Sequence, residues 1–201
     1  QMAKEGCGER NIEDLWIPYF SVATSLKTGN SYVHTLGPLW ESVRASTSIP
    51  GLLPPFIPDS EDDMWVDGGV INNAPVDVAY RFSPGKIILV NATQEKVFDG
   101  FDSFPPAYSG WSLLWNKINP FSKNKRIPNV VSLLFRSNEV TANLLLKKTL
   151  EEYPPSLIIS LPVQHYGMLD YKFGRKIEEE GYQYALEHIE EWRAQIFPES
   201  D

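Results

Sequence analysis

The hydrophobic and polar positions along the chain divide it into short apolar runs and amphipathic stretches. Residues 15–26 (LWIPYFSVATSL) are rich in aromatic and β-branched side chains, and the turn KTGN separates them from residues 31–36 (SYVHTL). Two such runs around a short turn predict a hairpin or paired strands. Residues 85–93 (GKIILVNAT) and 156–163 (SLIISLPV) are continuous apolar runs, which is typical of buried strands covered on both faces.

Other stretches have the spacing of helices. Residues 38–47 and 74–82 each have a proline suited to a first helical turn, and residues 139–153 and 173–192 continue the pattern farther along the chain. One face of the last helix would carry Ile177, Tyr184, Ala185, His188, Ile189 and Trp192. Strands that alternate with helices predict an α/β layered fold with a central, largely parallel sheet flanked by helices.

Composition narrows the class of protein. The 201 residues carry a net charge of −8, are 42% hydrophobic and are 22% charged, as expected of a globular protein and not of a nucleic-acid-binding surface. Cys7 is the single cysteine, which excludes an intrachain disulfide and favours an intracellular setting. No apolar run approaches the roughly 20 residues needed to span a bilayer. The chain begins with Gln1, which suggests a piece of a longer protein.

The stretch MWVDGGVINNAP, residues 64–75, is the first candidate for chemistry. Asp67 follows a short apolar run, and Gly68 and Gly69 come directly after it. Functional side chains of layered α/β proteins gather where strands end, and glycines allow a backbone to approach closely there. Asp-Gly is also a common turn pair, so the motif alone favours an ordinary turn.

Several longer blocks extend this observation. In chain order they are IEDLWIPYFSVATSLKTG, LWESVRASTSIPGLLPPF, MWVDGGVINNAPVDVA, SGWSLLWNKINPF and LDYKFGRKIEEEGYQYA. Together they resemble the second half of a patatin-like phospholipase domain, in the neuropathy target esterase (lysophospholipase) branch of that family. The resemblance runs over residues 12–192. It implies a patatin-like fold in which residues 1–201 are the C-terminal half of a single domain.

The resemblance also implies a function. Patatin-like enzymes are serine-type lipid ester hydrolases with a Ser–Asp dyad, and Asp67 would be the base of that dyad. Gly68 and Gly69 would form the supporting turn, with Asn72 and Asn73 as capping or bracing groups beside it. The implied substrate is a phospholipid or lysophospholipid, with no metal or organic cofactor. The implied location is intracellular and membrane-associated, at the cytoplasmic face of the endoplasmic reticulum in a eukaryote.

The expected nucleophile is not found in this sequence. The G-x-S-x-G motif that would carry it is absent: Ser31 and Ser112 each lack the second glycine, and Ser46 and Ser48 lie at a helix end. We therefore expect the serine and the oxyanion glycines to lie outside this chain, which would be inactive and poorly stable by itself. A truncated, noncatalytic paralogue that binds lipid or a protein partner remains the alternative.

Residues 97–126 combine aromatic and basic side chains. Trp111, Trp115 and Lys117 are the residue types found where proteins meet lipid headgroups, so they are candidate membrane contacts. A long connection held to the core by its aromatic rings is an equally good interpretation.

The remaining polar candidates indicate no separate site. His34, His165 and His188 have no metal-binding spacing and are expected to be packing or surface residues. Residues 58–63 (PDSEDD) lack the pattern of a calcium loop and predict a solvated loop. Arg44 is expected either to orient the substrate or to anchor its own helix.

Overall fold

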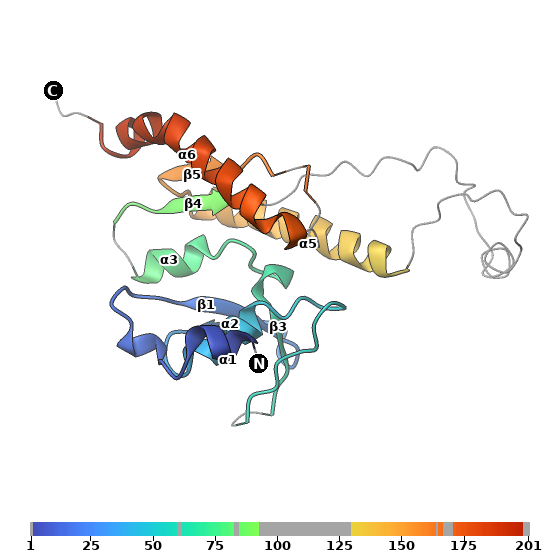
Figure 1. Cartoon of the computed structure of the whole chain (residues 1–201). Helices are drawn as coiled ribbons and strands as arrows, with labels where there is room; N and C mark the ends of the chain where they lie inside the picture. Colours follow the sequence, from blue (N-terminus) through green and yellow to red (C-terminus); the bar gives the residue numbers. More distant parts are fainter. Residues whose placement is uncertain are drawn as a thin grey trace, which may run out of the picture.

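The computed structural model describes residues 2–59, 62–82, 85–92, 130–163, 165–166 and 171–198. Helices and strands alternate along the chain, which confirms the α/β class. Their bounds are α1 Met2–Cys7, η1 Ile12–Asp14, β1 Ser21–Ser25, β2 Ser31–His34, α2 Leu39–Ser46, β3 Trp65–Asp67, η2 Gly68–Val70, α3 Val76–Phe82, β4 Ile88–Asn91, α5 Val130–Glu152, β5 Leu157–Ser160, η3 Tyr171–Phe173 and α6 Gly174–Ile196. Figure 1 shows β1, β3, α1 and α2 on one side of α3, with β4, β5 and α6 on the other.

β1 is the central strand of a three-stranded sheet, in the order β2-β1-β3. The predicted hairpin is confirmed, since β1 and β2 pair antiparallel around residues 26–30, where Gly29 has φ +70°. β3 also pairs antiparallel with β1. The expectation of a largely parallel sheet is therefore wrong for these three strands. A tight turn returns the chain antiparallel from β1 to β2, and β3 reaches the other edge of β1 after α2, also antiparallel to it.

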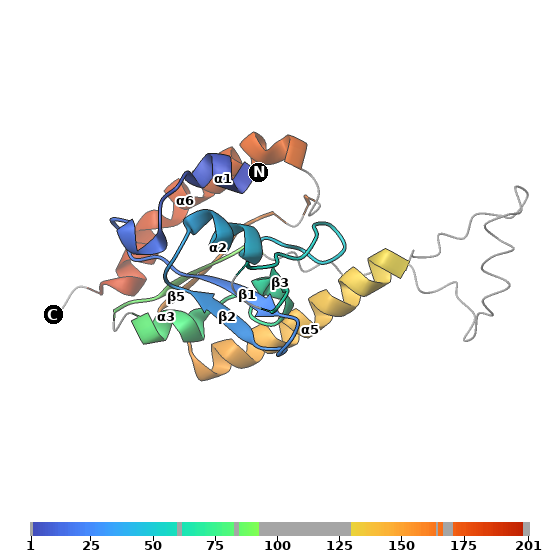
Figure 2. The ribbon, with the colours of Figure 1, turned by 90° about the horizontal axis from the view of Figure 1, so that it is seen from below.

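α2 covers this sheet, as Figure 2 shows from below. The predicted helix at residues 38–47 is confirmed, and it buries Ser42 and Ala45. The core cluster consists of Ala23, Ala45 and Trp65, with Tyr32 and Phe56 packed against it. Because β1 has a neighbouring strand on each edge and a helix against it, all of its residues are buried. β1 is therefore the best-protected element near the candidate site.

β4 and β5 form a separate two-stranded parallel sheet. α5 lies in the connection between them, as a parallel pair requires a long crossover. A second cluster of Ala74, Val76 and Ile87 joins this sheet to α3 and α5, and Ala79, Leu89, Leu146, Leu150 and Tyr153 pack against it. Parallel pairing and the helices predicted in this half of the chain are confirmed, although α5 begins well before the predicted residue 139.

The prediction that these two strands are covered on both faces is wrong for the part of the chain that the structure describes. Ile88 and Val90 are 49% and 57% exposed, whereas Leu89 packs against the second cluster. Successive strand residues point to opposite faces, so one face of β4 is covered and the other is partly open. An apolar run shows that a strand can be buried, but it does not show which elements reach it.

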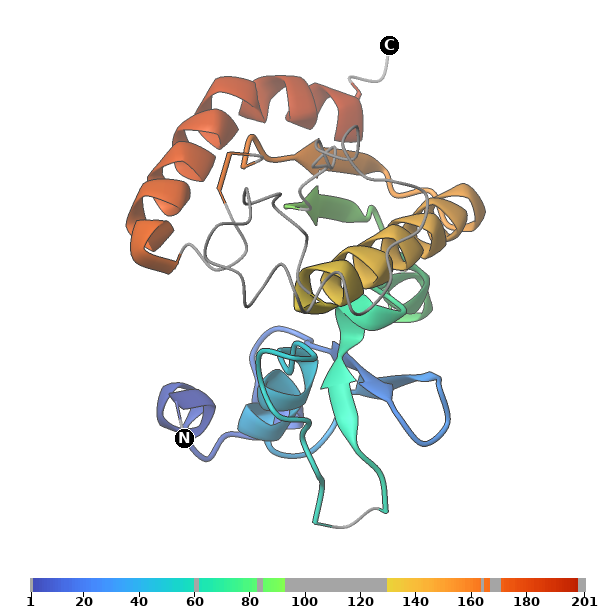
Figure 3. The same ribbon diagram turned by 90° about the vertical axis from the view of Figure 1, so that its right-hand side faces the viewer.

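α6 has the amphipathic face expected from its sequence. Tyr184, His188 and Trp192 are partly buried, and their rings lie together, with Tyr184 and His188 centroids 4.3 Å apart. Ile189, predicted on the same face, is about half exposed. Figure 3 shows α6 and β5 at the opposite end of the molecule from α1 and α2.

His34 is a packing residue of the first sheet, as expected. It is 7% exposed, and its ring lies 4.7 Å from that of Tyr32 and 4.9 Å from that of Trp65. Its Nε2 has no hydrogen-bond partner among the described residues. Burial lowers the pKa of His34 to about 4. The neutral ring is therefore favoured in the folded protein.

We expect the stability of the chain to fall on acidification because of His34. Between pH 6.5 and 4 the unfolded chain binds a proton at this residue and the folded chain does not, so the free energy of unfolding decreases by up to about 3 kcal/mol across that window. His34→Phe should remove this component of the pH dependence in urea unfolding at pH 7 and pH 5. His165→Gln, at an exposed histidine, is the control and should retain it.

Candidate active site

Asp67 is the last residue of β3 and caps the short helix η2. Its Oδ1 accepts a hydrogen bond from the backbone N–H of Gly69, at 2.7 Å. Its own N–H donates to the carbonyl of Ser48 at 3.0 Å, and its carbonyl accepts from the Thr24 hydroxyl at 3.0 Å. The backbone on both sides of the carboxylate is thus tied to β1 and to the end of α2, which holds the side chain in one orientation.

Both glycines lie close to neighbouring atoms, and at Gly68 those atoms belong to the backbone of β1. A Cβ on Gly68 would lie 2.3 Å from the carbonyl oxygen of Val22 in β1, a distance that no side chain can occupy. A Cβ on Gly69 would lie 2.9 Å from the Asp67 carboxylate and 2.9 Å from the Asn73 side-chain oxygen. Neither glycine has positive φ. The turn therefore needs glycine at position 68 for space rather than for unusual backbone angles, whereas at Gly69 the neighbouring atoms are ends of side chains that can shift.

Asn72 and Asn73 follow the turn and both contribute to the cleft beside it. The Asn72 backbone N–H donates to the Gly68 carbonyl at 2.8 Å, and its side-chain amide donates to Asp77 at 2.9 Å. Since Asp77 lies in the first turn of α3, Asn72 links the turn to that helix. The Asn73 side-chain oxygen lies over Gly69. These positions agree with bracing of the turn.

A cleft of about 300 Å³ opens beside Asp67. It is lined by Tyr19, Phe20, Ser21, Val22, Ser46, Asp67, Gly68, Gly69, Asn72, Asn73 and Pro75. Burial raises the pKa of the Asp67 carboxyl above its ordinary value, and the hydrogen bond from Gly69 acts in the opposite direction. A partly desolvated carboxylate at a cleft is a better proton acceptor than one in water, so the site is suited to general-base chemistry.

The sequence did not reveal that Tyr19, Phe20 and Ser46 line this cleft. Tyr19 and Phe20 directly precede β1, and Ser46 is the last residue of α2. These side chains come beside Asp67 because β1 pairs with β3 and α2 covers β1. The only signal in the sequence was their position at the ends of predicted elements, and that signal does not specify which ends meet.

Arg44 lies behind the cleft and anchors its own helix. Its guanidinium donates to the Ser48 hydroxyl and, at 2.9 Å, to the carbonyl of Pro54. Ser48 is fully buried, and its carbonyl receives the N–H of Asp67. Arg44 therefore supports the backbone beneath the carboxylate, which favours the anchoring alternative over contact with a substrate.

The other candidates fall in different places. Among the described residues the Asp67 carboxylate accepts no hydrogen bond from a serine hydroxyl, and Ser31 is exposed on β2. In the loop predicted at residues 58–63, the Asp62 carboxylate forms an ion pair with Lys27 Nζ at 3.1 Å. Ser112, the segment 97–126 and its candidate membrane contacts Trp111, Trp115 and Lys117 lie outside the described residues.

The described residues contain neither a metal-binding cluster nor a membrane-spanning helix. No group of three or more histidine, cysteine, aspartate or glutamate side chains there is placed to hold a metal ion. No helix in the described ranges is long and apolar enough to cross a membrane.

We expect Gly68→Ala to lower the free energy of unfolding by about 1–3 kcal/mol, because the new methyl group would overlap the Val22 carbonyl. Gly181→Ala is the matched control: the space around Gly181 in α6 is open, so alanine there should raise helix stability by about 1 kcal/mol. Urea unfolding of the two variants measures both effects. Equal stability of Gly68→Ala and the parent would contradict the close approach.

Comparison with known proteins gives a consistent set of relatives. A profile of the family described as patatin-like phospholipase matches residues 2–80, which include Asp67. Patatin-like phospholipase domain-containing protein 7 of Rattus norvegicus is 33% identical over 92% of this chain. Lysophospholipase NTE1 of Mycosarcoma maydis is 34% identical over 93%, and neuropathy target esterase sws of Drosophila melanogaster is 31% identical over 91%. The matches span 14%, 10% and 13% of these relatives, so the chain corresponds to a small part of each.

Proposed function

Since the chain belongs to the patatin-like phospholipase family, we propose that it is part of a serine-type lipid ester hydrolase in which Asp67 is the general base. The relatives named lysophospholipase and neuropathy target esterase support an ester of a phospholipid or lysophospholipid as the substrate. Because such lipids reside in membranes, the longer protein would act at a membrane surface. The chain covers a small part of its relatives, so the activity is assigned to that longer protein.

The observation that carries this proposal is the position of the Asp67 carboxylate. It lies at a cleft, is held by the Gly69 N–H and has a pKa raised by burial. A serine hydroxyl is too weakly acidic to attack an ester at a useful rate unless a base removes its proton. Asp67 has the charge and the exposure to the cleft that this role requires.

The nucleophilic serine is proposed to come from a segment of the longer protein outside this chain and to enter the cleft beside Asp67. Its oxygen would form a bond to the ester carbonyl carbon as its proton moves to the Asp67 carboxylate. Asp67 would then protonate the departing alcohol, and water would release the fatty acid by the same route. Backbone N–H groups of the same outside segment would stabilise the oxyanion.

A second candidate is a noncatalytic paralogue that binds lipid or a protein partner. It is favoured by the fact that no described serine hydroxyl is hydrogen-bonded to Asp67. The same cleft would then serve binding only. The two proposals differ in whether the longer protein hydrolyses an ester.

Asp67→Asn is expected to abolish catalysis while preserving the fold. The amide oxygen can still accept the Gly69 N–H, and removal of a partly buried charge should leave the unfolding temperature equal or higher. Loss of the base should lower kcat by about 10²- to 10⁴-fold. Both properties are measured on the longer protein that contains this chain, by fatty acid release from a lysophospholipid and by thermal unfolding.

The matched control is Ser46→Ala, which removes a hydroxyl from the same cleft and should leave most of the activity. The wild-type rate should fall as the pH drops through the raised pKa of Asp67, because a protonated carboxyl cannot accept the serine proton. If Asp67→Asn keeps more than about a tenth of the wild-type rate, Asp67 is not the base. If Ser46→Ala is inactive, the nucleophile lies within this chain.

A further inference from the structure

The segment of residues 15–19, LWIPY, is an apolar stretch presented to solvent. Trp16 is 101% exposed and Ile17 is 78% exposed, and Tyr19 is also exposed. Two of the three most exposed large apolar side chains among the described residues are thus neighbours in one short segment. Single exposed apolar residues are normal on protein surfaces, but a contiguous group of them indicates a contact surface.

The exposure is not that of a loose chain end, because both ends of the segment are fixed. On one side the Ile12 N–H donates to the Gly37 carbonyl at 2.9 Å, and the Leu39 N–H donates to the Arg10 carbonyl at 2.9 Å. The Glu13 carboxylate accepts the Gly37 N–H at 2.8 Å. On the other side the buried strand β1 begins at Ser21. Trp16 and Ile17 are therefore held away from the core that the described residues form.

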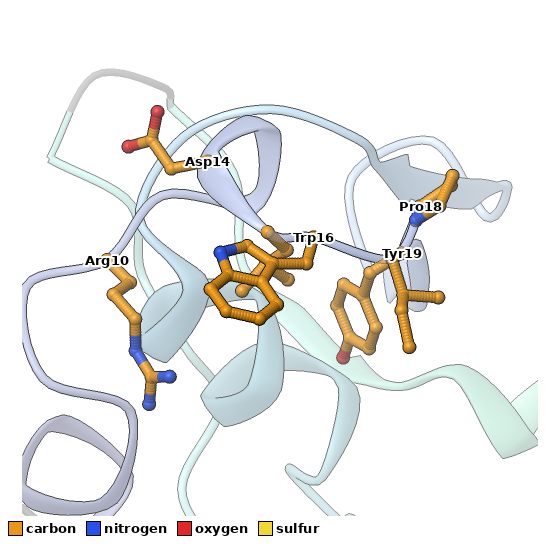
Figure 4. A pocket seen from close by; sticks show the side chains of 7 residues that line it. Arg10, Asp14, Trp16, Pro18 and Tyr19 are labelled. Carbon is orange, nitrogen blue, oxygen red and sulfur yellow. The ribbon is translucent and has the colours of Figure 1, made fainter.

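The segment also encloses a hollow that adjoins the candidate active site. Residues Arg10, Asp14, Leu15, Trp16, Ile17, Pro18 and Tyr19 line an open hollow of about 430 Å³, shown in Figure 4. Tyr19 lines both this hollow and the cleft beside Asp67, and Phe20 continues into that cleft. An aliphatic chain lying along the segment would thus be led toward the carboxylate.

The charges beside the hollow indicate the kind of surface that fits it. Arg10 donates through Nε to the Cys7 carbonyl, and no carboxylate in the described ranges forms an ion pair with it. Its cationic group is therefore available to a phosphate. The whole chain carries a net charge of −8, which opposes binding to a strongly anionic layer. A zwitterionic phospholipid offers the phosphate without that repulsion.

We propose that Trp16 and Ile17 insert into the surface of a zwitterionic phospholipid layer, with Arg10 against a headgroup phosphate. Tryptophan is the side chain that most favours the boundary between headgroups and acyl chains, and isoleucine adds apolar area below it. Where the proposed hydrolase function holds, this contact places a lipid chain at Tyr19, next to the cleft of Asp67. The membrane contact itself does not depend on hydrolysis.

The first experiment measures partition of the longer protein that contains this chain onto phosphatidylcholine vesicles by cosedimentation. The double variant Trp16→Ser with Ile17→Ser should bind at least about tenfold more weakly, because two apolar side chains no longer leave water. The matched control is Tyr182→Ser with Leu186→Ser, which removes two exposed apolar side chains from α6 and should change binding by less than about twofold. Trp16→Phe with Ile17→Leu should retain most of the binding.

Circular dichroism and unfolding curves show whether each variant is folded. The proposal is overturned if the wild-type protein does not bind these vesicles or if the serine double variant binds as well as the wild type. It is also overturned if binding requires anionic lipid, or if the conservative double variant loses binding as fully as the serine variant.

Hydrolysis by the longer protein tests the membrane contact and the hydrolase function separately. With Trp16→Ser and Ile17→Ser, the rate on vesicle lipid should fall at least about tenfold more than the rate on a monomeric short-chain ester. Equal losses on both substrates would overturn the proposed role in delivering lipid. If the wild-type protein hydrolyses neither substrate but the vesicle binding follows the pattern above, the hydrolase function fails and the membrane contact stands.

Discussion

The contact between the turn after β3 and the backbone of β1 is the constraint on which the candidate site depends. Gly68 passes so close to the Val22 carbonyl that a side chain has no room there. This approach is possible because β1 and β3 pair antiparallel, with Ala23 opposite Asp67. The Asp67 carboxylate then accepts a hydrogen bond from the Gly69 N–H, and the backbone N–H of Asp67 donates to the Ser48 carbonyl. The position of Asp67 is therefore fixed largely by contacts of the backbone.

Burial acts on two titratable groups of this sheet in opposite ways. His34 is neutral when buried and fills space beside Trp65, so its cost appears only in acid. Asp67 is partly buried as an ion at neutral pH, which disfavours the charged form and raises its pKa. A packing residue such as His34 can avoid the cost of burying a charge by staying neutral. A general base cannot, because a carboxyl group must be ionised to accept a proton. This difference in protonation distinguishes His34, a structural group, from Asp67, a candidate functional group of the same sheet.

The cleft and the exposed apolar segment meet because they share the entry to β1. Tyr19 contributes to both, and the segment is held by Gly37 and Leu39, which precede or begin α2. The same short piece of chain thus connects an exposed tryptophan to the carboxylate. A hydrolase of lipids needs such a connection, because its substrate must leave a layer before it reaches the base. The proposed membrane contact and the proposed base are thus joined by one short segment of the chain.

The sequence by itself determined the local features: the hairpin around KTGN, the helices of residues 38–47 and 173–192, the Asp-Gly-Gly turn and the family. Each depends on neighbouring residues, on helical periodicity or on blocks of preserved order. Only the tertiary structure decided that the first three strands pair antiparallel, that Ile88 and Val90 remain partly exposed, and that Tyr19 and Ser46 face Asp67. It also separated the anchoring role of Arg44 from substrate contact. These outcomes depend on which surfaces meet across long stretches of chain, and hydrophobic patterns specify that a face is apolar without specifying what covers it.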